Sequence, residues 1–211
     1  MKEVKKIYQD AYAKHGNSIK SILIPKGRQN ERFDSLAMYI KDAEVSVLDF
    51  GCGLGHLNHY LASKFSNLHY TGTDIVDEFI QENTKNYPKS TFYKISSYKD
   101  VTENYDYIIA AGVFNIKYDP DTATHKTIVY DHLKHLLDKT NKVLSVNFMT
   151  DQVDFIQEGA YHQNVTELYE YATQNLSKRV VIDQSYMPYE FTIHIFKDQE
   201  IVRPDNIYKS I

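Results

Sequence analysis

Residues 47–56 constrain the fold most strongly, because a short apolar run opens there into three glycines at alternate positions. The run at residues 45–50 is rich in apolar and β-favouring side chains, which is typical of a buried parallel strand. Gly51, Gly53 and Gly55 follow it, and glycine is favoured where the backbone turns sharply or lies close to a ligand. The stretch therefore predicts a strand, a tight turn and a helix, with a ligand site at the carboxyl end of the strand.

The glycine spacing separates two classes of cofactor. The dinucleotide pattern GxGxxG needs its third glycine one residue later, where this chain has His56. The order from Asp49 to Gly55 instead resembles the first motif of class I S-adenosylmethionine-dependent methyltransferases. That cofactor has a ribose, an adenine and a methionine tail but no pyrophosphate. A nicotinamide-dependent oxidoreductase is therefore the less favoured alternative.

A second acidic residue, Asp74, ends the next strand-like run, residues 68–73. It follows the glycines by about 20 residues, as a ribose ligand does in nucleotide-binding folds. A carboxylate there can accept charge-assisted hydrogen bonds from both ribose hydroxyls, and the resemblance implies this role. The alternative is that Asp74 caps the helix expected from Ile75 onward. Its pairing with the glycines favours ribose binding.

The resemblance also implies an α/β architecture for the whole chain. It predicts a Rossmann-like, seven-stranded, mostly parallel sheet with helices on both faces, an antiparallel last strand and an N-terminal helical lid. Strand-like and helix-like runs alternate as such a sheet requires. We expect a single methyltransferase domain over residues 1–211, with a lid at 1–44, a core at 45–197 and a tail at 198–211.

Further cofactor contacts follow from the resemblance. Family members contact the adenine just after the third strand, where this chain has Ser97 and Tyr98, although no fixed motif marks this position and a plain loop is the favoured alternative. They meet the methionine amino group at the end of the fourth strand, here residues 111–113. Arg32 is suited to pair with the methionine carboxylate through its planar guanidinium, although a solvated surface arginine is equally consistent with the sequence. The predicted cofactor-binding residues are Asp49, Phe50, Gly51, Cys52, Gly53, Gly55, Asp74, Ile75, Ser97, Tyr98, Ala111, Gly112, Val113 and Arg32.

The acceptor site has a weaker signature. Asn115 follows the fourth strand and can either orient an acceptor hydroxyl or amine or form a turn. The NPPY signature of amino-methyltransferases is absent there, which removes the usual support for methylation of a DNA base or a glutamine amide. Tyr8, Tyr12 and His15 are candidates for the lid, although ordinary packing or surface positions are equally consistent with the sequence. Tyr12, His15 and Tyr189, which is near the C-terminal strands, are further predicted substrate contacts, and residues 149–164 are expected to shape the pocket. No residue stands out as a catalytic base.

These features predict transfer of a methyl group from S-adenosylmethionine, with S-adenosylhomocysteine as product, to an oxygen or nitrogen of a small molecule or glycan precursor. The alternative within the same fold is a protein that binds the cofactor without catalysis. The net charge of −4 argues against a dedicated nucleic-acid surface, which needs clustered basic residues. No apolar run approaches a membrane span and no signal peptide is visible, so we expect a cytoplasmic enzyme.

The histidine pairs His56/His59 and His132/His135 are spaced three residues apart, but no third ligand accompanies either pair. No metal is therefore expected. The single cysteine, Cys52, excludes an internal disulfide.

Overall fold

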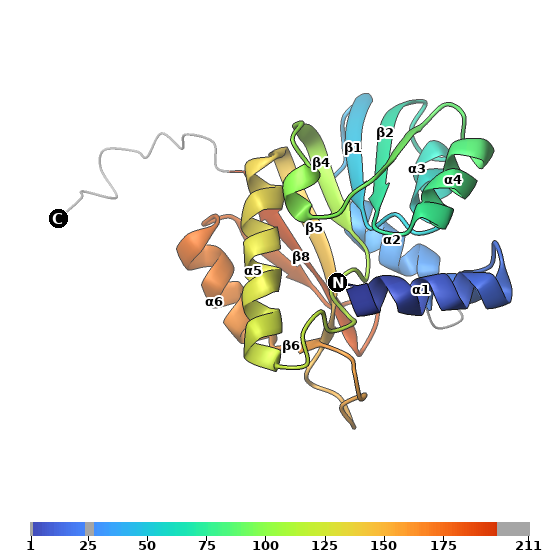
Figure 1. Cartoon of the computed structure of the whole chain (residues 1–211). Helices are drawn as coiled ribbons and strands as arrows, with labels where there is room; N and C mark the ends of the chain where they lie inside the picture. Colours follow the sequence, from blue (N-terminus) through green and yellow to red (C-terminus); the bar gives the residue numbers. More distant parts are fainter. Residues whose placement is uncertain (1, 24–27, 198–211) are drawn as a thin grey trace, which may run out of the picture.

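The computed structural model describes residues 2–23 and 28–197, and the predicted tail at 198–211 lies outside the described residues. Within those ranges, one eight-stranded sheet has the order β3-β2-β1-β4-β5-β8-β7, with the short β6 beside β5 (Figure 1). The strands are β1 Glu44–Phe50, β2 Asn67–Asp74, β3 Thr91–Lys94, β4 Tyr105–Ala110, β5 Thr140–Thr150, β6 His162–Gln163, β7 Val180–Asp183 and β8 Glu190–Phe196. Of the strand pairs in this part of the chain, only those made by β8 are antiparallel. The predicted Rossmann-like fold with an antiparallel last strand is confirmed.

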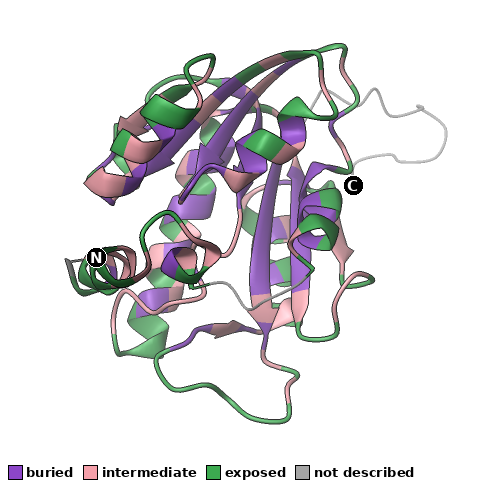
Figure 2. Ribbon diagram, turned by 90° about the vertical axis from the view of Figure 1, so that its right-hand side faces the viewer, coloured by how far each residue is buried: buried purple, intermediate pink, exposed green. Residues whose placement is uncertain are grey.

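The helices cover both faces of the sheet and its carboxyl edge. They are α1 Lys2–His15, η1 Ile19–Ile22, α2 Gln29–Ala37, α3 His56–Ala62, α4 Asp77–Asn86, η2 Tyr98–Asp100, α5 Thr122–Asp138 and α6 Val165–Asn175. On β1, Leu48 faces the core beneath α5 and α6, whereas its neighbour Val47 faces the core beneath α2 and α3. Successive side chains of a strand point to opposite faces, so a central strand covered on both sides is apolar at consecutive positions. Figure 2 shows these central strands as the buried part of the molecule.

The connection order creates a crevice beside β1. From β1 the chain proceeds outward to β2 and β3, and then returns to β4 on the other side of β1. In open α/β sheets, ligands bind where the strand order reverses in this way, outside the carboxyl ends of the strands. The glycine turn, which follows β1, lies at this point.

The N-terminal segment lies across the carboxyl edge of the sheet (Figure 1). Helix α1 contacts α4 through an ion pair of 2.7 Å between Lys5 Nζ and Asp77 Oδ2 and a 2.9 Å hydrogen bond from Gln9 Nε2 to Glu78 Oε1. Its inner face packs Tyr8 edge-to-face on Phe79, with ring centroids 6.3 Å apart. This segment forms a roof over the crevice.

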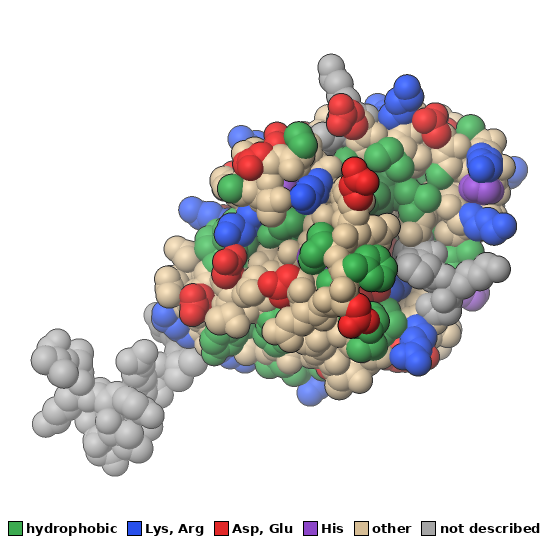
Figure 3. Space-filling view, turned by 90° about the horizontal axis from the view of Figure 1, so that it is seen from below, with side chains coloured by type: hydrophobic (Ala, Val, Ile, Leu, Met, Phe, Trp, Pro, Cys, Tyr) green, Lys and Arg blue, Asp and Glu red, His purple; other side chains and the backbone are tan. Residues whose placement is uncertain are grey.

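The loop between β5 and β6 forms the opposite rim. Phe155 and Ile156, at its tip, are exposed, whereas Gln157 and Ala160 line the cavity described below. Figure 3, which views the molecule from below, shows hydrophobic side chains interspersed with acidic and basic ones.

Candidate active site

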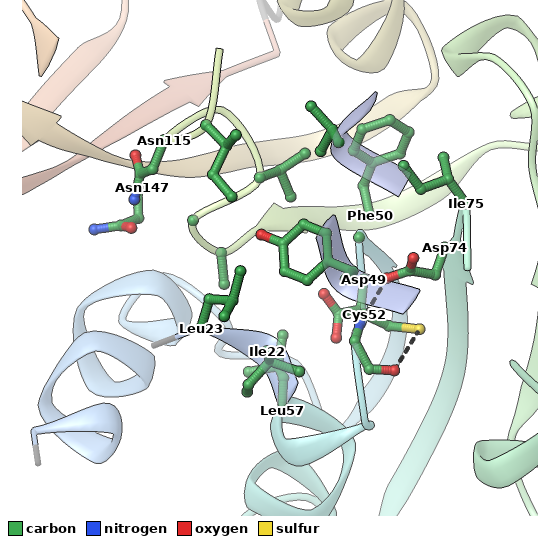
Figure 4. Close-up of a pocket in the computed structure, with 18 of the residues that line it drawn as sticks. Ile22, Leu23, Asp49, Phe50, Cys52, Leu57, Asp74, Ile75, Asn115 and Asn147 are labelled. Atoms are coloured by element: carbon green, nitrogen blue, oxygen red, sulfur yellow. Dashed lines mark hydrogen bonds between the residues drawn. The ribbon is translucent and has the colours of Figure 1, made fainter. Parts of the chain in front are cut away.

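A cavity of about 490 Å³ opens at the carboxyl ends of β1, β2, β4 and β5, beneath the N-terminal roof (Figure 4). Its volume lies in the range typical of small-molecule sites. The predicted residues that line it are Arg32, Asp49, Phe50, Gly51, Cys52, Gly53, Asp74, Ile75, Ser97, Tyr98, Ala111, Gly112, Val113 and Asn115. Four others, Tyr12, His15, Gly55 and Tyr189, are not part of this lining.

The glycine turn is held by backbone contacts. Gly51, Gly53 and Gly55 have φ of 79°, 50° and 72°, in the left-handed region that favours glycine. The Gly51 N–H donates to Thr73 O at 2.8 Å, which ties the turn to β2. A Cβ on Gly51 would lie 2.5 Å from Val113 Cγ2. The turn therefore requires glycine both for its conformation and for its space.

Gly55 lies behind the turn rather than in the cavity. A Cβ there would meet Tyr87 Cε2 at 2.7 Å and Asn83 Oδ1 at 3.0 Å. The need for glycine at position 55 is explained by the packing of α3 against α4, and not by the close approach of a ligand.

Asp74 connects the turn to the end of β2. Its Oδ2 accepts a hydrogen bond from Gly53 N and its Oδ1 accepts one from Val76 N, both at 2.9 Å. Helix α4 has Val76 at its N-cap, so Asp74 is not the capping residue. Each oxygen keeps a lone pair beyond these bonds, which is what two ribose hydroxyls require. Burial raises the pKa of Asp74 to about 6, although the backbone hydrogen bonds from Val76 and Gly53 oppose the shift.

Asp49 presents an unsatisfied oxygen beside the turn. Its Oδ2 accepts from the Tyr70 hydroxyl, whereas Oδ1 is buried with no hydrogen-bond partner among the described residues. Burial raises the pKa of this carboxyl to about 7, against the opposing hydrogen bond from Tyr70. A buried carboxylate oxygen without a donor fits a cationic ammonium group. The methionine half of S-adenosylmethionine carries one.

Arg32 is placed differently from the prediction. Its Nε and Nη2 donate to the Glu190 carboxylate at 2.7 and 2.6 Å, so its paired donors are taken by a residue 158 positions away. Both side chains are almost fully buried and line the cavity. The Nη1 atom is buried without a partner in the described part of the chain. Only Nη1 remains available to a ligand carboxylate.

One wall of the cavity is formed by the aromatic rings of Tyr98 and His132. The Tyr98 ring lies 4.3 Å from that of His132, centroid to centroid, and both line the cavity. Burial lowers the pKa of His132 to about 4, so the ring is neutral near pH 7. Its Nδ1 lies 2.7 Å from Ile128 O and must donate to that carbonyl, which leaves Nε2 as an acceptor. This wall suits a flat heteroaromatic ring such as adenine.

The three predicted substrate contacts outside the cavity have other partners or positions. Tyr12 packs on Phe79 and its hydroxyl donates to Glu82, whereas Tyr8, one helical turn earlier, lines the cavity. His15 is the last residue of α1, beyond the cavity. Tyr189 is about half exposed and donates to Asp154.

Several cavity residues were not predicted. These include Ile22, Leu23, His132, Asn147 and Glu190. The sequence could have pointed to Asn147 and Glu190, because each is a polar residue within or at the start of an otherwise apolar strand. Such a side chain must find a partner when it is buried.

No group of three or more His, Cys, Asp or Glu side chains suited to a metal ion is present in residues 2–23 and 28–197. Among the described helices, none combines the length and apolar character needed to cross a membrane.

Comparison with known proteins agrees with the fold and the glycine turn. A family model described as a methyltransferase domain matches residues 48–144. A Mycobacterium tuberculosis protein provisionally named a methyltransferase is 26% identical over 157 residues, covering 72% of this chain and 93% of that protein. The release factor glutamine methyltransferase of Streptococcus pneumoniae is 24% identical over 155 residues, covering 71% of this chain but 55% of that protein.

Solved structures share the fold. Magnesium protoporphyrin IX methyltransferase from Synechocystis, with bound S-adenosylhomocysteine, superposes with a TM-score of 0.65 at 18% identity, covering 92% of this chain and 94% of that one. The plantazolicin methyltransferase BpumL, in complex with a triazolic desmethylPZN analog and S-adenosylhomocysteine, gives a TM-score of 0.66 at 17% identity, covering 93% of this chain and 97% of that one.

The fold is the Rossmann-like fold of class I methyltransferases, and residues 48–144 match a methyltransferase domain, in agreement with the sequence resemblance. The matched methyltransferase domain begins within β1 and ends within β5, and it therefore contains the glycine turn and Asp74.

Proposed function

We infer that this protein transfers the methyl group of S-adenosylmethionine to an oxygen or nitrogen of a small molecule or glycan precursor. The observation that carries the proposal is the meeting of three features in one cavity: the glycine turn, Asp74 at the end of the neighbouring strand, and the unpartnered Oδ1 of Asp49. Together they match a ligand with a ribose, an ammonium group and a chain that lies flat against glycine backbone. The cytoplasmic location expected from the sequence is part of the same proposal.

The proposal assigns a role to each main polar group of the cavity and to several of its walls. Asp74 holds the ribose, Asp49 attracts the ammonium group, and Arg32 Nη1 pairs with the carboxylate. Ser97, Tyr98 and Ile75 lie around the adenine, and the backbone of residues 111–113 closes over the methionine tail. The roof residues exclude water from this end of the cavity.

Methyl transfer from a sulfonium does not require a dedicated general base. When bound, S-adenosylmethionine supplies a methyl group on a sulfonium, which is already a good leaving group. The protein must hold the acceptor atom about 3 to 3.5 Å from that carbon and in line with the departing sulfur. Buried walls that fix both partners can therefore provide most of the rate enhancement.

Isothermal titration calorimetry with S-adenosylmethionine and S-adenosylhomocysteine tests the proposal. The wild type is expected to bind both, and Asp74→Asn to bind at least about tenfold more weakly, because it loses charge-assisted hydrogen bonds to ribose. Asp138→Asn, a matched change at an exposed residue on α5, is the control and should bind as the wild type does. The proposal would be overturned if the wild type bound neither S-adenosylmethionine nor S-adenosylhomocysteine, or if it bound NADH instead.

A further inference from the structure

A buried polar network lies at one end of the cavity. The Glu190 carboxylate, held by Arg32, also accepts a hydrogen bond from Asn147 Nδ2 at 3.0 Å. The same Nδ2 donates to the Tyr186 hydroxyl at 2.8 Å. Figure 4 shows Asn147 at the opposite end of the cavity from Asp74. The network therefore lies at the end of the cavity away from the ribose, where an acceptor would bind beside the methionine carboxylate that Arg32 Nη1 holds.

The network fixes which way the Asn147 amide faces. A carboxylate paired with arginine is ionised and can only accept hydrogen bonds, so the Asn147 atom beside Glu190 must be the nitrogen. Turning the amide over would place Oδ1 against a carboxylate oxygen. The two hydrogens of Nδ2 are thus used by Glu190 and Tyr186, and Oδ1 has a single allowed orientation.

Asn147 Oδ1 is then a buried acceptor that receives no hydrogen bond. Asn147 is fully buried, it lines the cavity, and Oδ1 has no partner within the described residues. Buried polar atoms in native proteins are almost always paired, so the vacant acceptor indicates a ligand that donates a hydrogen bond. A carboxylate or thiolate has no hydrogen to give and would face both Oδ1 and the negative charge of Glu190.

Apolar side chains line the cavity beside this polar network. The neighbouring Asn115 accepts from Met149 N at 3.2 Å, and the adjacent Ile116 pairs with Ala160 across the rim. Met149, Ile116 and Ala160 all line the cavity. Such walls favour an apolar ligand body over a sugar, whose many hydroxyls each need a partner.

We propose that Asn147 Oδ1 binds the O–H or N–H group of the methyl acceptor, which is a neutral and largely apolar molecule, and that Glu190 is the positioning residue that orients the Asn147 amide. This proposal rests on the proposed function, because it assigns the methyl acceptor of the same cavity. It divides the cavity into a cofactor end, which binds the ribose and the ammonium group, and an acceptor end, which selects a hydrogen-bond donor, with Arg32 at the boundary between them. It also predicts that carboxylates are not substrates.

Four ring compounds that differ in a single group test this assignment by fluorine NMR titration of the S-adenosylhomocysteine-saturated protein. The probes are para-fluorophenol, para-fluoroaniline, para-fluoroanisole and para-fluorobenzoate. The first two donate a hydrogen bond, the third does not, and the fourth is anionic. The phenol and the aniline are expected to bind about tenfold or more tightly than the other two.

Three variants identify the residues responsible. Asn147→Leu keeps the approximate shape but cannot accept a hydrogen bond, so the phenol and the anisole should then bind equally. Asn141→Leu, the same change at an exposed position on the same strand, should preserve the preference. Glu190→Gln supplies an amide that can donate to Oδ1 and allow the Asn147 amide to turn over, so it should weaken the preference while Asn147 is still present.

The outcomes separate this inference from the proposed function. If S-adenosylhomocysteine does not bind to the wild type, the proposed function fails. If it binds, but the phenol does not bind or binds no better than the anisole, only the acceptor assignment is overturned. If Asn147→Leu does not fold, as judged by circular dichroism, Glu190→Gln decides, and an unchanged preference in that variant would overturn the positioning role.

Discussion

The two ends of the cavity are built in different ways. At the cofactor end, Asp49, Gly51, Gly53 and Asp74 belong to β1, to the turn that follows it and to the end of the next strand. Backbone N–H groups donate hydrogen bonds that tie the turn to Asp74 and to β2. At the acceptor end, side chains from three distant elements, α2, β5 and β8, hold one another. A local turn can be read from sequence spacing, whereas a network of distant side chains depends on the complete fold.

This difference also separates what each end contributes. The cofactor end leaves polar atoms available for a ligand at Asp49 and Asp74, so changes there should reduce binding. The acceptor end contains a buried ion pair, so changes there should reduce the stability of the protein as well. The following four experiments test this distinction, from the largest expected effect to the smallest.

Arg32→Met should lower the free energy of unfolding by about 3–5 kcal/mol, because it leaves the Glu190 carboxylate buried without its cation. Urea denaturation measures this change. The double variant Arg32→Met/Glu190→Met should recover most of the loss, since no unpaired charge remains. The exposed pair Lys64–Asp34 provides the control, and Lys64→Met should change the stability by no more than about 1 kcal/mol. Equal losses at both pairs would remove the distinction between the two ends.

Gly51→Ala should weaken the binding of S-adenosylhomocysteine about 100-fold, because the new Cβ would lie 2.5 Å from Val113 Cγ2 and displace the turn. Gly159→Ala is a matched control, since Gly159 also has a positive φ, of 74°, but no atom within 4 Å of the added Cβ. It carries the same kind of backbone strain without the clash. Calorimetry on both variants separates the effect of backbone strain from that of the clash. Similar affinities of the two variants for S-adenosylhomocysteine would show that the space at Gly51 is not needed.

The pH dependence should have opposite signs for binding and for stability. The raised pKa values of Asp74, about 6, and Asp49, about 7, mean that the folded protein holds these protons more tightly than the unfolded chain does. Their contribution to stability is therefore full below about pH 4 and is lost as the pH rises through about 6 to 7. Affinity for S-adenosylhomocysteine should instead rise about tenfold between about pH 5 and about pH 8, because the ionised carboxylates bind its ribose and ammonium group.

Calorimetric titrations across this range, together with thermal unfolding of the ligand-free protein, measure both trends. Asp74→Asn should remove the lower part of the affinity increase. An affinity that stays constant across the range would contradict the roles assigned to the two carboxylates.

Tyr8→Ala should weaken cofactor binding by about three- to fivefold, because it removes one apolar side chain from the roof of the cavity. Tyr12→Ala is the matched control four residues along the same helix, where the ring packs on Phe79 outside the cavity lining. Surface plasmon resonance with the two variants compares them. A larger effect from Tyr12 would reverse the assignment of the roof residue.

The sequence predicted the sheet, and it singled out the glycine turn and Asp74, which the structure brings together at one cavity. The glycines and Asp74 carry local requirements on backbone conformation and on the end of a strand, which spacing reveals. Arg32 lines the cavity, but its partner Glu190 could not be predicted, because the two residues are 158 positions apart and no local pattern links α2 to β8. Tyr8 and Tyr12 lie on the same face of one helix, so periodicity alone could not decide which of them reaches the cavity.

The roof is attached to α4 by polar contacts as well as by packing. The ion pair between Lys5 and Asp77 and the hydrogen bond from Tyr12 to Glu82 lie at the periphery, where dissolved ions screen charge within about 10 Å at 0.1 M ionic strength. Added salt should weaken these two polar contacts while leaving the aromatic contacts on Phe79 intact. The rates at which small molecules enter and leave the cavity would then increase with ionic strength, so ligand exchange would depend on the salt concentration around the protein.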